Sequence, residues 1–239
     1  MELSALEKWM YRVMSAIYES GIPIDFKGAM VLKACLLEAG YPHEIRHTLD
    51  IDANWYTDTD PSSDQMVKSL EKALQKSGID LAVRQYRMYG ERRYAGFELL
   101  DPSSDEVLFT MDVDVNRPLQ PTKIYEVTGF QFRGVAPYQM LADKISAIST
   151  DKVFQRIKDV VDLYYLAQVF ELDRDRLLKT MESSGRLLGD FDGFLNGVPS
   201  LRHAYNKFRF TGEVNKPDFE DVYETVHSYV RDIVPMRDE

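Results

Sequence analysis

The stretch RHTLDIDANW, residues 46–55, places Asp50 and Asp52 one residue apart within an apolar run. We expect a strand over about residues 45–53, whose side chains alternate between the two faces of a sheet. The expected polar face comprises Arg46, Thr48, Asp50, Asp52 and Asn54. The opposite, mostly apolar face comprises Ile45, His47, Leu49, Ile51 and Ala53.

Two like charges about 7 Å apart on one strand face repel each other unless water or a cation separates them. The spacing of Asp50 and Asp52 suits the joint binding of a hard cation such as Mg²⁺, which prefers carboxylate oxygen. The alternative is an exposed strand with two solvated aspartates, although Asp is depleted in strands.

A second stretch, VLFTMDVDVN over residues 107–116, repeats this pattern. Its expected polar face comprises Leu108, Thr110, Asp112, Asp114 and Asn116. If the two acidic strands are neighbours, up to four carboxylates converge on one sheet face, where repulsion favours a bound metal or a cationic side chain.

A glycine turn precedes the first acidic strand, in FKGAMVLKACL over residues 26–36. A Gly28–Ala29 turn at the start of a helix exposes backbone N–H groups at the positive end of the helix dipole, which suits a triphosphate. The alternative is an ordinary tight turn from a strand into a helix. Cys35, on the apolar helix that follows, is expected in the core.

The composition limits the class of protein. The chain has 239 residues and a formal net charge of −10, which argues against passive nucleic-acid binding because phosphate contacts need clustered Lys and Arg. The basic stretch VRQYRMYGERRY, residues 83–94, is interpreted as a solvated hairpin. No apolar run is long enough to span a bilayer, and the early acidic residues and single cysteine favour a cytoplasmic protein.

Hydrophobic periodicity predicts an α+β fold, a mixed sheet with flanking helices followed by a C-terminal helical bundle. We expect two domains, residues 1–135 and 136–239, with the active site in the cleft between them. The predicted helices cover residues 4–19, the segment after Gly28 up to Gly40, and a segment that starts at Ser62 and Gln65, which form a capping box. Further helices are expected over residues 138–169, 173–183, 199–209 and 217–233.

Taken together, the glycine turn, the D-h-D strand (h, an apolar residue) and the later acidic strand resemble the nucleotidyltransferases of the polymerase β superfamily. The run YQMLADKISAISTDKVFQRIKDVVDLYYLA, residues 138–167, narrows this to the AbiEii/AbiGii-type toxin nucleotidyltransferases. The matching C-terminal residues are Asp143, Lys144, Ile145, Lys158, Asp159, Asp162, Leu163 and Tyr164. The matching upstream residues are Lys27, Gly28, Arg46, Thr48, Asp50, Ile51 and Asp52.

This resemblance implies roles for the matching residues. Asp50 and Asp52 would hold Mg²⁺, with Asp112 or Asp114 as a base or third metal ligand. Lys144 would bind nucleotide phosphate, and Asp159 or Asp162 would activate the acceptor or hold the lysine. The turn residues Lys27, Gly28 and Ala29, together with Arg46 and Thr48, would complete the nucleotide site. Ala29 stands where the family usually has Gly or Ser, so the turn is kept but a hydroxyl is lost.

The C-terminal residues also have simpler interpretations. Lys144 lies at the edge of an apolar helix stripe, where a lysine either extends to solvent or lines a cleft. Lys158 and Asp162 are four residues apart, which suits an ordinary surface ion pair on a helix.

The function predicted is Mg²⁺-dependent transfer of a nucleoside monophosphate from an NTP to an acceptor hydroxyl, with tRNA or another RNA as a possible acceptor. The resemblance implies the toxin of a bacterial toxin–antitoxin or phage-defence pair, with a cognate antitoxin as a possible partner. Two alternatives remain open: a non-catalytic nucleotide- or partner-binding protein on the same fold, and a metal-dependent phosphohydrolase.

Overall fold

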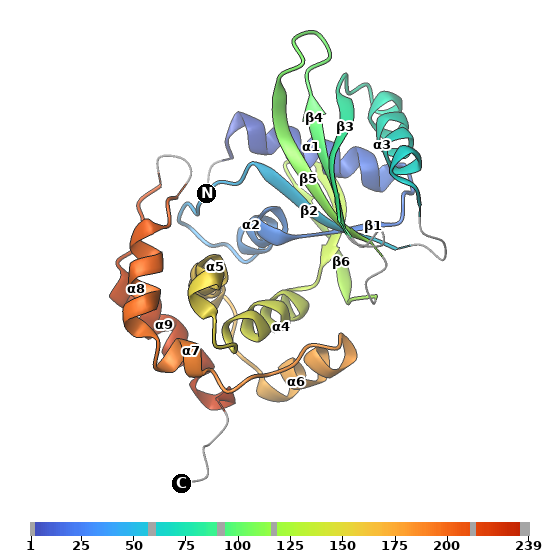
Figure 1. The fold of residues 1–239 in the computed structure, drawn as a ribbon. Helices are drawn as coiled ribbons and strands as arrows, with labels where there is room; N and C mark the ends of the chain where they lie inside the picture. Colours follow the sequence, from blue (N-terminus) through green and yellow to red (C-terminus); the bar gives the residue numbers. More distant parts are fainter. Residues whose placement is uncertain (1–2, 57–60, 90–93, 116–118, 211–213, 235–239) are drawn as a thin grey trace. The chain divides into compact units, whose positions relative to one another are not determined.

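The computed structural model describes residues 3–56, 61–89, 94–115, 119–210 and 214–234 (Figure 1). Arg92, Arg93 and Asn116 of the acidic and basic stretches lie outside the described residues. The chain forms two compact units. The sheet unit comprises residues 1–37 and 47–135, and the helical unit comprises residues 38–46 and 136–239.

The sheet unit contains seven described strands in the order β3-β4-β5-β2-β1-β7-β6. The strands are β1 (Ile24–Lys27), β2 (Asp50–Trp55), β3 (Ala82–Tyr89), β4 (Tyr94–Leu100), β5 (Val107–Val115), β6 (Thr122–Val127) and β7 (Phe130–Val135). The β1–β7 and β2–β5 pairs are parallel and the other neighbouring pairs are antiparallel. The sheet is therefore mixed, which confirms the predicted fold class.

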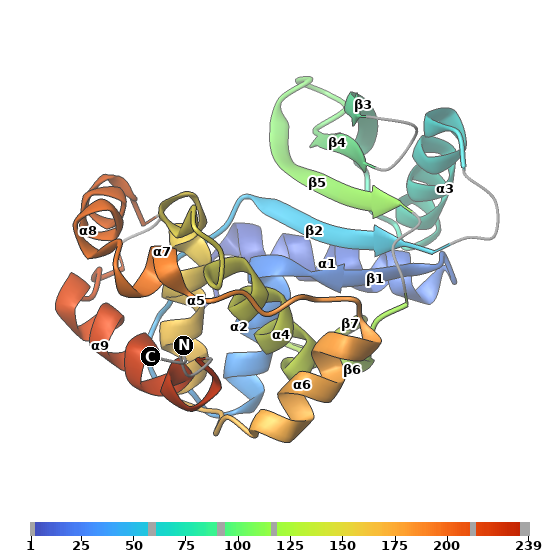
Figure 2. The ribbon, with the colours of Figure 1, turned by 60° about the horizontal axis from the view of Figure 1, so that its bottom comes forward.

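Three described helices accompany the strands of the sheet unit. They are α1 (Ala5–Glu19), α2 (Gly28–Glu38) and α3 (Ser63–Lys76). Helix α1 packs mainly against β7 and α3, and α3 packs against β3. Figure 2 shows α1 and α3 beside the strands of the sheet. The Phe132 ring of β7 stacks on Tyr11 of α1 and on Tyr125 of β6, each at a centroid distance of 5.6 Å. A Cβ on Gly134 would meet the Val31 side chain of α2 at 3.0 Å, so glycine allows this helix to pack tightly on β7.

The starts of two helices follow the sequence signals. Ser62 and Gln65 form the expected capping box of α3, in which each side chain bonds the backbone N–H of the other. Ser4 and Glu7 form a second capping box, at α1. Cys35 is buried on α2, as predicted.

One strand boundary was predicted wrongly. The structure begins β2 at Asp50 rather than at residue 45, so the expected alternation does not extend to the residues before it. Leu49, assigned to the apolar face, is 53% exposed, and Arg46, assigned to the polar face, is buried in the helical unit. The segment over residues 38–46 leaves the sheet because its partners lie among the C-terminal helices.

The helical unit contains α4 (Pro137–Ile148), η1 (Val153–Arg156), α5 (Ile157–Ala167), α6 (Arg174–Ser183), α7 (Asp192–Leu195), α8 (Val198–Lys207), α9 (Phe219–Val230) and η2 (Arg231–Ile233). The helical stretch expected over residues 138–169 is therefore broken between α4 and α5. The short α7 was not predicted. Within this unit, α5 packs against α4 and α9, and α4 packs against α6.

Candidate functional site

The carboxylates of β2 and β5 form an acidic face on the sheet, defined here as Asp50, Asp52, Asp112 and Asp114. The two strands are parallel neighbours, and their register pairs Asp52 with Asp112 and Asn54 with Asp114. Ile51, Ala53, Met111 and Val113 alternate with these residues and are fully buried, whereas the four carboxylate residues remain partly exposed. Since adjacent strands lie about 4.8 Å apart, the acidic face concentrates negative charge.

A lysine on the adjacent strand supplies positive charge to the acidic face. Lys27 is the register partner of Asp52 on β1. Its Nζ lies 2.5 Å from Oδ2 of Asp114, so the side chain reaches over β2 to β5. The ammonium group thereby offsets part of the repulsion among the carboxylates.

The turn into α2 brings the backbone close to Asp52. Gly28 has φ +71°, a left-handed conformation that favours glycine. A Cβ on Gly28 would lie 1.9 Å from Oδ2 of Asp52, so no other residue fits here without displacing the carboxylate. This close approach sets the Asp52 carboxylate beside the first turn of α2, where backbone N–H groups lack helical partners.

Two hydroxyl groups orient other carboxylates of the acidic face. Thr48 Oγ1 donates to Oδ1 of Asp50 at 2.5 Å. Tyr86 of β3 donates its hydroxyl to Oδ1 of Asp112 at 3.1 Å, and its ring lies close over Gly96 of β4. Burial and the Asp112 charge raise the pKa of Tyr86, so the phenol remains a hydrogen-bond donor.

The donor set of the acidic face fits Mg²⁺ by its chemistry. Within the described ranges, His, Cys, Asp and Glu side chains form no group of three or more that would enclose a metal. Mg²⁺ needs no such cage, because it commonly binds one or two carboxylates and completes its shell with water and substrate phosphates. Asp50 and Asp52 would supply those two carboxylates.

In the helical unit, residues implied by the resemblance form an ion cluster, defined here as Arg46, Lys144, Asp159 and Asp162. The Lys144 Nζ lies 2.6 Å from Asp162 Oδ2. The Arg46 guanidinium donates to both Asp162 oxygens at 3.1–3.2 Å. Lys144 is 7% exposed and Asp162 2%, so Lys144 neither extends to solvent nor stands unpaired in a cleft.

The charges within the ion cluster hold its members ionised. Burial opposes the charge of Asp162, but Lys144 and Arg46 outweigh it and lower the pKa of this carboxyl. Burial likewise opposes the charge of Lys144, but Asp162 and Asp159 outweigh it and raise the pKa of the ammonium. The simpler alternative of a surface pair between Lys158 and Asp162 does not hold, since Asp162 is buried and binds Arg46 and Lys144.

Asp159 occupies the more accessible edge of the ion cluster. Its Oδ1 lies 3.4 Å from Lys144 Nζ, a longer contact than that of Asp162. Its Oδ2 lies 2.8 Å from the Arg156 guanidinium, which is half exposed. Of its two carboxylate partners, Lys144 would therefore lose less interaction energy by giving up Asp159 than by giving up Asp162.

The structure also contains a buried polar cluster that the sequence analysis missed. Lys33 of α2 donates to Glu7 Oε1 at 2.7 Å, and His47 Nδ1 lies 2.9 Å from the same oxygen. Burial opposes the charge of Glu7, but hydrogen bonds from Lys33 and Ser4 outweigh it and lower the pKa of the carboxyl. Glu7, Lys33 and His47 are too far apart in the sequence to form a recognisable motif. The one sequence signal of this cluster was the position of Lys33 among the apolar residues of α2, which indicates a lysine that needs a buried partner.

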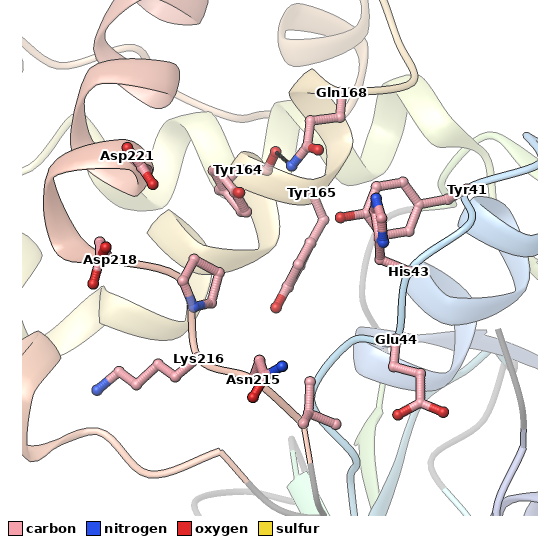
Figure 3. Close-up of a pocket in the computed structure, with 12 residues that line it drawn as sticks. Tyr41, His43, Glu44, Tyr164, Tyr165, Gln168, Asn215, Lys216, Asp218 and Asp221 are labelled. Atoms are coloured by element: carbon pink, nitrogen blue, oxygen red, sulfur yellow. Dashed lines mark hydrogen bonds between the residues drawn. The ribbon is translucent and has the colours of Figure 1, made fainter.

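A cavity of about 600 Å³ lies within the helical unit, next to α5 and the start of α9 (Figure 3). We call it the tyrosine pocket. It is lined by Tyr41, His43, Glu44, Tyr164, Tyr165, Gln168, Val214, Asn215, Lys216, Pro217, Asp218 and Asp221. Of these lining residues, the sequence analysis singled out Tyr164 alone, as one of the residues that match the family.

The family of the protein is established by a match over most of the chain, and not only by the site residues described above. Residues 13–225 match the model of the family described as "Nucleotidyl transferase AbiEii toxin, Type IV TA system". The chain belongs to the AbiEii nucleotidyltransferase toxin family. Membership identifies it as a nucleotidyltransferase that uses an NTP and as a toxin of a toxin–antitoxin system. No curated protein matches the chain significantly.

Solved structures share the fold of this AbiEii-family protein. MenT4, a nucleotidyltransferase toxin from Mycobacterium tuberculosis H37Rv, is similar with a TM-score of 0.61 and 14% identity, over 98% of this chain and 84% of MenT4. An antigenic nucleotidyltransferase-like protein from Paracoccidioides brasiliensis is similar with a TM-score of 0.50 and 16% identity, over 87% of this chain and 95% of that protein. At these identities the likeness shows the fold alone.

None of the helices in the described part of the AbiEii-family chain combines the length and apolarity needed to cross a membrane.

Proposed function

We propose that the protein transfers a nucleoside monophosphate from an NTP to an acceptor hydroxyl, with Mg²⁺ held by Asp50 and Asp52. The observation that carries this proposal is the contact between Asp52 and Gly28. This contact puts the Asp52 carboxylate, which we propose as a metal ligand, beside a helix start whose N–H groups suit phosphate. A Mg²⁺ ion bound by these carboxylates would neutralise the triphosphate and lower the pKa of the attacking hydroxyl.

The acidic face then supplies the remaining groups for the transfer. The acceptor oxygen forms a bond to the α-phosphorus, the bond to the β-phosphate oxygen breaks, and pyrophosphate leaves. We assign the acceptor proton to Asp112, because Asp112 is the register partner of Asp52 whereas Asp114 is bound by Lys27. Tyr86 keeps the Asp112 carboxylate oriented, and Thr48 does the same for Asp50.

On the family resemblance, we also propose Lys144 of the helical unit as a phosphate-binding residue. Its long contact with Asp159 would be exchanged for a phosphate oxygen, while Asp162 continues to hold the ammonium in place. Arg46 acts on the lysine through Asp162 and is a positioning residue in this scheme. Lys27 and Ala29 flank the glycine turn, where Lys27 limits the charge of the acidic face.

The biological setting follows from the same proposal. We expect the reaction in the cytoplasm, with tRNA or another RNA as the acceptor, in a bacterial toxin–antitoxin or phage-defence pair. Family membership supports the toxin role and an antitoxin partner. The acceptor is proposed on chemical grounds, since an RNA end offers the hydroxyl that the reaction needs.

Labelled NTPs test this proposal directly. The protein is incubated with Mg²⁺, total bacterial RNA and each α-labelled NTP in turn, alongside Asp52→Ala and the control Asp80→Ala, which alters an exposed acid of the sheet unit. Label on RNA with the wild type and the control, absent with Asp52→Ala, supports transfer. NTP loss without labelled RNA would instead indicate a phosphohydrolase, and no reaction with any NTP a binding protein.

A further inference from the structure

The aromatic side chains of the tyrosine pocket form a connected cluster. The Tyr165 ring contacts Tyr41 edge-to-face at a centroid distance of 5.9 Å and Tyr164 at 5.4 Å. Tyr41 in turn contacts His43 at 5.6 Å. Rings packed edge-to-face present faces in different directions, and an aromatic face attracts a cation through its negative quadrupole.

The charged residues of the tyrosine pocket are mostly acidic. Glu44, Asp218 and Asp221 line it, and within the described residues no salt bridge neutralises these three carboxylates. The lining lysine, Lys216, is turned to one side in Figure 3. Its Nζ donates to the backbone carbonyls of Tyr205 and Phe208, so its hydrogen bonds are already committed. The lining therefore carries three carboxylates against one ammonium group, which leaves it with a net negative charge.

One buried polar atom of the tyrosine pocket lacks a partner. The Tyr165 side chain is 2% exposed, yet its hydroxyl makes no hydrogen bond among the described residues. In Figure 3 this side chain extends between Tyr164 and Tyr41 into the space that the pocket residues surround. A buried hydroxyl without a partner is rare and unfavourable, so the atom is set to receive a ligand.

These features select among ligand classes. Phosphates would be repelled by the three carboxylates, and a wholly apolar ligand would leave the Tyr165 hydroxyl and the carboxylates unpaired. An ammonium or guanidinium group fits, because it stacks on tyrosine faces, forms charge-assisted bonds to carboxylates and donates N–H to the Tyr165 oxygen. Burial raises the pKa of Tyr165, so its hydroxyl stays neutral.

We propose that the tyrosine pocket is a binding site for an organic cation, an ammonium or guanidinium group. The cation is either a free metabolite or a side chain of a bound peptide. The site is formed by the helical unit alone, and it does not depend on the proposed nucleotide transfer.

Calorimetric titration of the full-length protein at low salt tests the charge requirement. N-acetylarginine amide is compared with N-acetylcitrulline amide, which has nearly the same shape without the charge. We expect the arginine derivative to bind about tenfold more tightly. Agmatine and spermidine are titrated as examples of free cationic metabolites. If both bind more tightly than the arginine derivative, the natural ligand is a free metabolite and not a peptide side chain.

Variants then locate the binding site. Asp218→Asn/Asp221→Asn is expected to weaken cation binding about tenfold, whereas the control Asp175→Asn/Glu182→Gln, which removes two exposed acids from α6, leaves it unchanged. Tyr165→Phe removes only the unpaired hydroxyl and is expected to weaken binding without lowering the melting temperature. A melting temperature lowered by Tyr165→Phe would show that the hydroxyl has a structural role instead.

Three results would overturn the proposal. They are the absence of binding by every cation, equal binding of the arginine and citrulline derivatives, and tighter binding of a neutral nucleoside such as cytidine or adenosine. The last result would identify the tyrosine pocket as a nucleobase site.

Discussion

In the ion cluster of the helical unit, Asp162 is buried between Lys144 and Arg46, whereas on the sheet four partly exposed carboxylates line up beside Lys27. The ion cluster satisfies its charges internally. On the acidic face, Lys27 is one positive charge beside four carboxylates, and a divalent cation would further reduce the repulsion among them. The buried Asp162 pairs thus serve mainly stability in the helical unit, whereas the partly exposed carboxylates of the sheet unit serve ligand binding, and the following variants test that difference.

The largest effect on stability is expected in the ion cluster. Asp162→Ala leaves Lys144 and Arg46 buried beside an uncompensated space, which should lower the free energy of unfolding by about 3–5 kcal/mol. Urea unfolding measures the change. Asp159→Ala, at the accessible edge of the same cluster, should cost about 1 kcal/mol or less. Equal losses for the two variants would show that Asp162 is not the centre of the cluster.

The glycine turn should have the next largest effect. In Gly28→Ala the new Cβ would displace the Asp52 carboxylate, so nucleotide transfer should fall about a hundredfold and stability by about 1–3 kcal/mol. Gly129→Ala is the matched control, because Gly129 has φ +85° and open space around its Cα. If both variants lose transfer activity, the cause is backbone strain and not the displacement of the Asp52 carboxylate.

Removing the lysine beside the acidic face should increase its affinity for Mg²⁺. Lys27→Met removes the ammonium bound to Asp114, so the field on the carboxylates becomes more negative and Mg²⁺ affinity should rise about threefold or more. A thermal-shift titration with Mg²⁺ measures this affinity. Lys68→Met on α3 changes the net charge equally at an exposed position and should leave the affinity unchanged. A lower affinity in Lys27→Met would place the lysine among the groups that assist the metal.

The smallest expected effect is a pH dependence from the ion cluster. The pKa of Asp162 is lowered in the folded protein, so its contribution to stability is present above the unfolded value of about 4 and is lost as the pH falls toward the folded value. Asp162→Asn should reduce the slope of the free energy of unfolding below pH 4 by up to about 1.4 kcal/mol per pH unit. Urea titrations between pH 2.5 and 6 measure that slope, and an unchanged slope would mean that Asp162 is not paired when folded.

Local patterns in the sequence predicted much of the fold. The alternation of Asp50 with Ile51 and of Asp112 with Met111 gave the faces of β2 and β5, because strand geometry depends only on neighbouring residues. The capping pair Ser62–Gln65 gave the start of α3 for the same reason. The family resemblance, rather than spacing alone, brought Lys144 and Asp162 into the candidate site.

Contacts between distant residues were not predictable in this way. The bond from Tyr86 to Asp112 depends on the sheet order β3-β4-β5, and the pairing of Arg46 with Asp162 joins residues 116 positions apart. No local pattern indicated that residues 38–46 join the helical unit, so Arg46 was assigned to a strand face. The tyrosine pocket likewise draws its lining from three separate segments of the chain.

Thermal unfolding with Mg²⁺ and a non-hydrolysable analogue of each NTP in turn tests the central claim, that the acidic face binds a metal–nucleotide complex. The wild type should gain about 3 °C in melting temperature with at least one analogue. The double variant Asp175→Asn/Glu182→Gln, which removes two exposed acids from α6, should gain the same amount, and Asp50→Asn/Asp52→Asn should gain nothing. An equal gain in the Asp50→Asn/Asp52→Asn protein, or no gain in the wild type with any analogue, would contradict the claim.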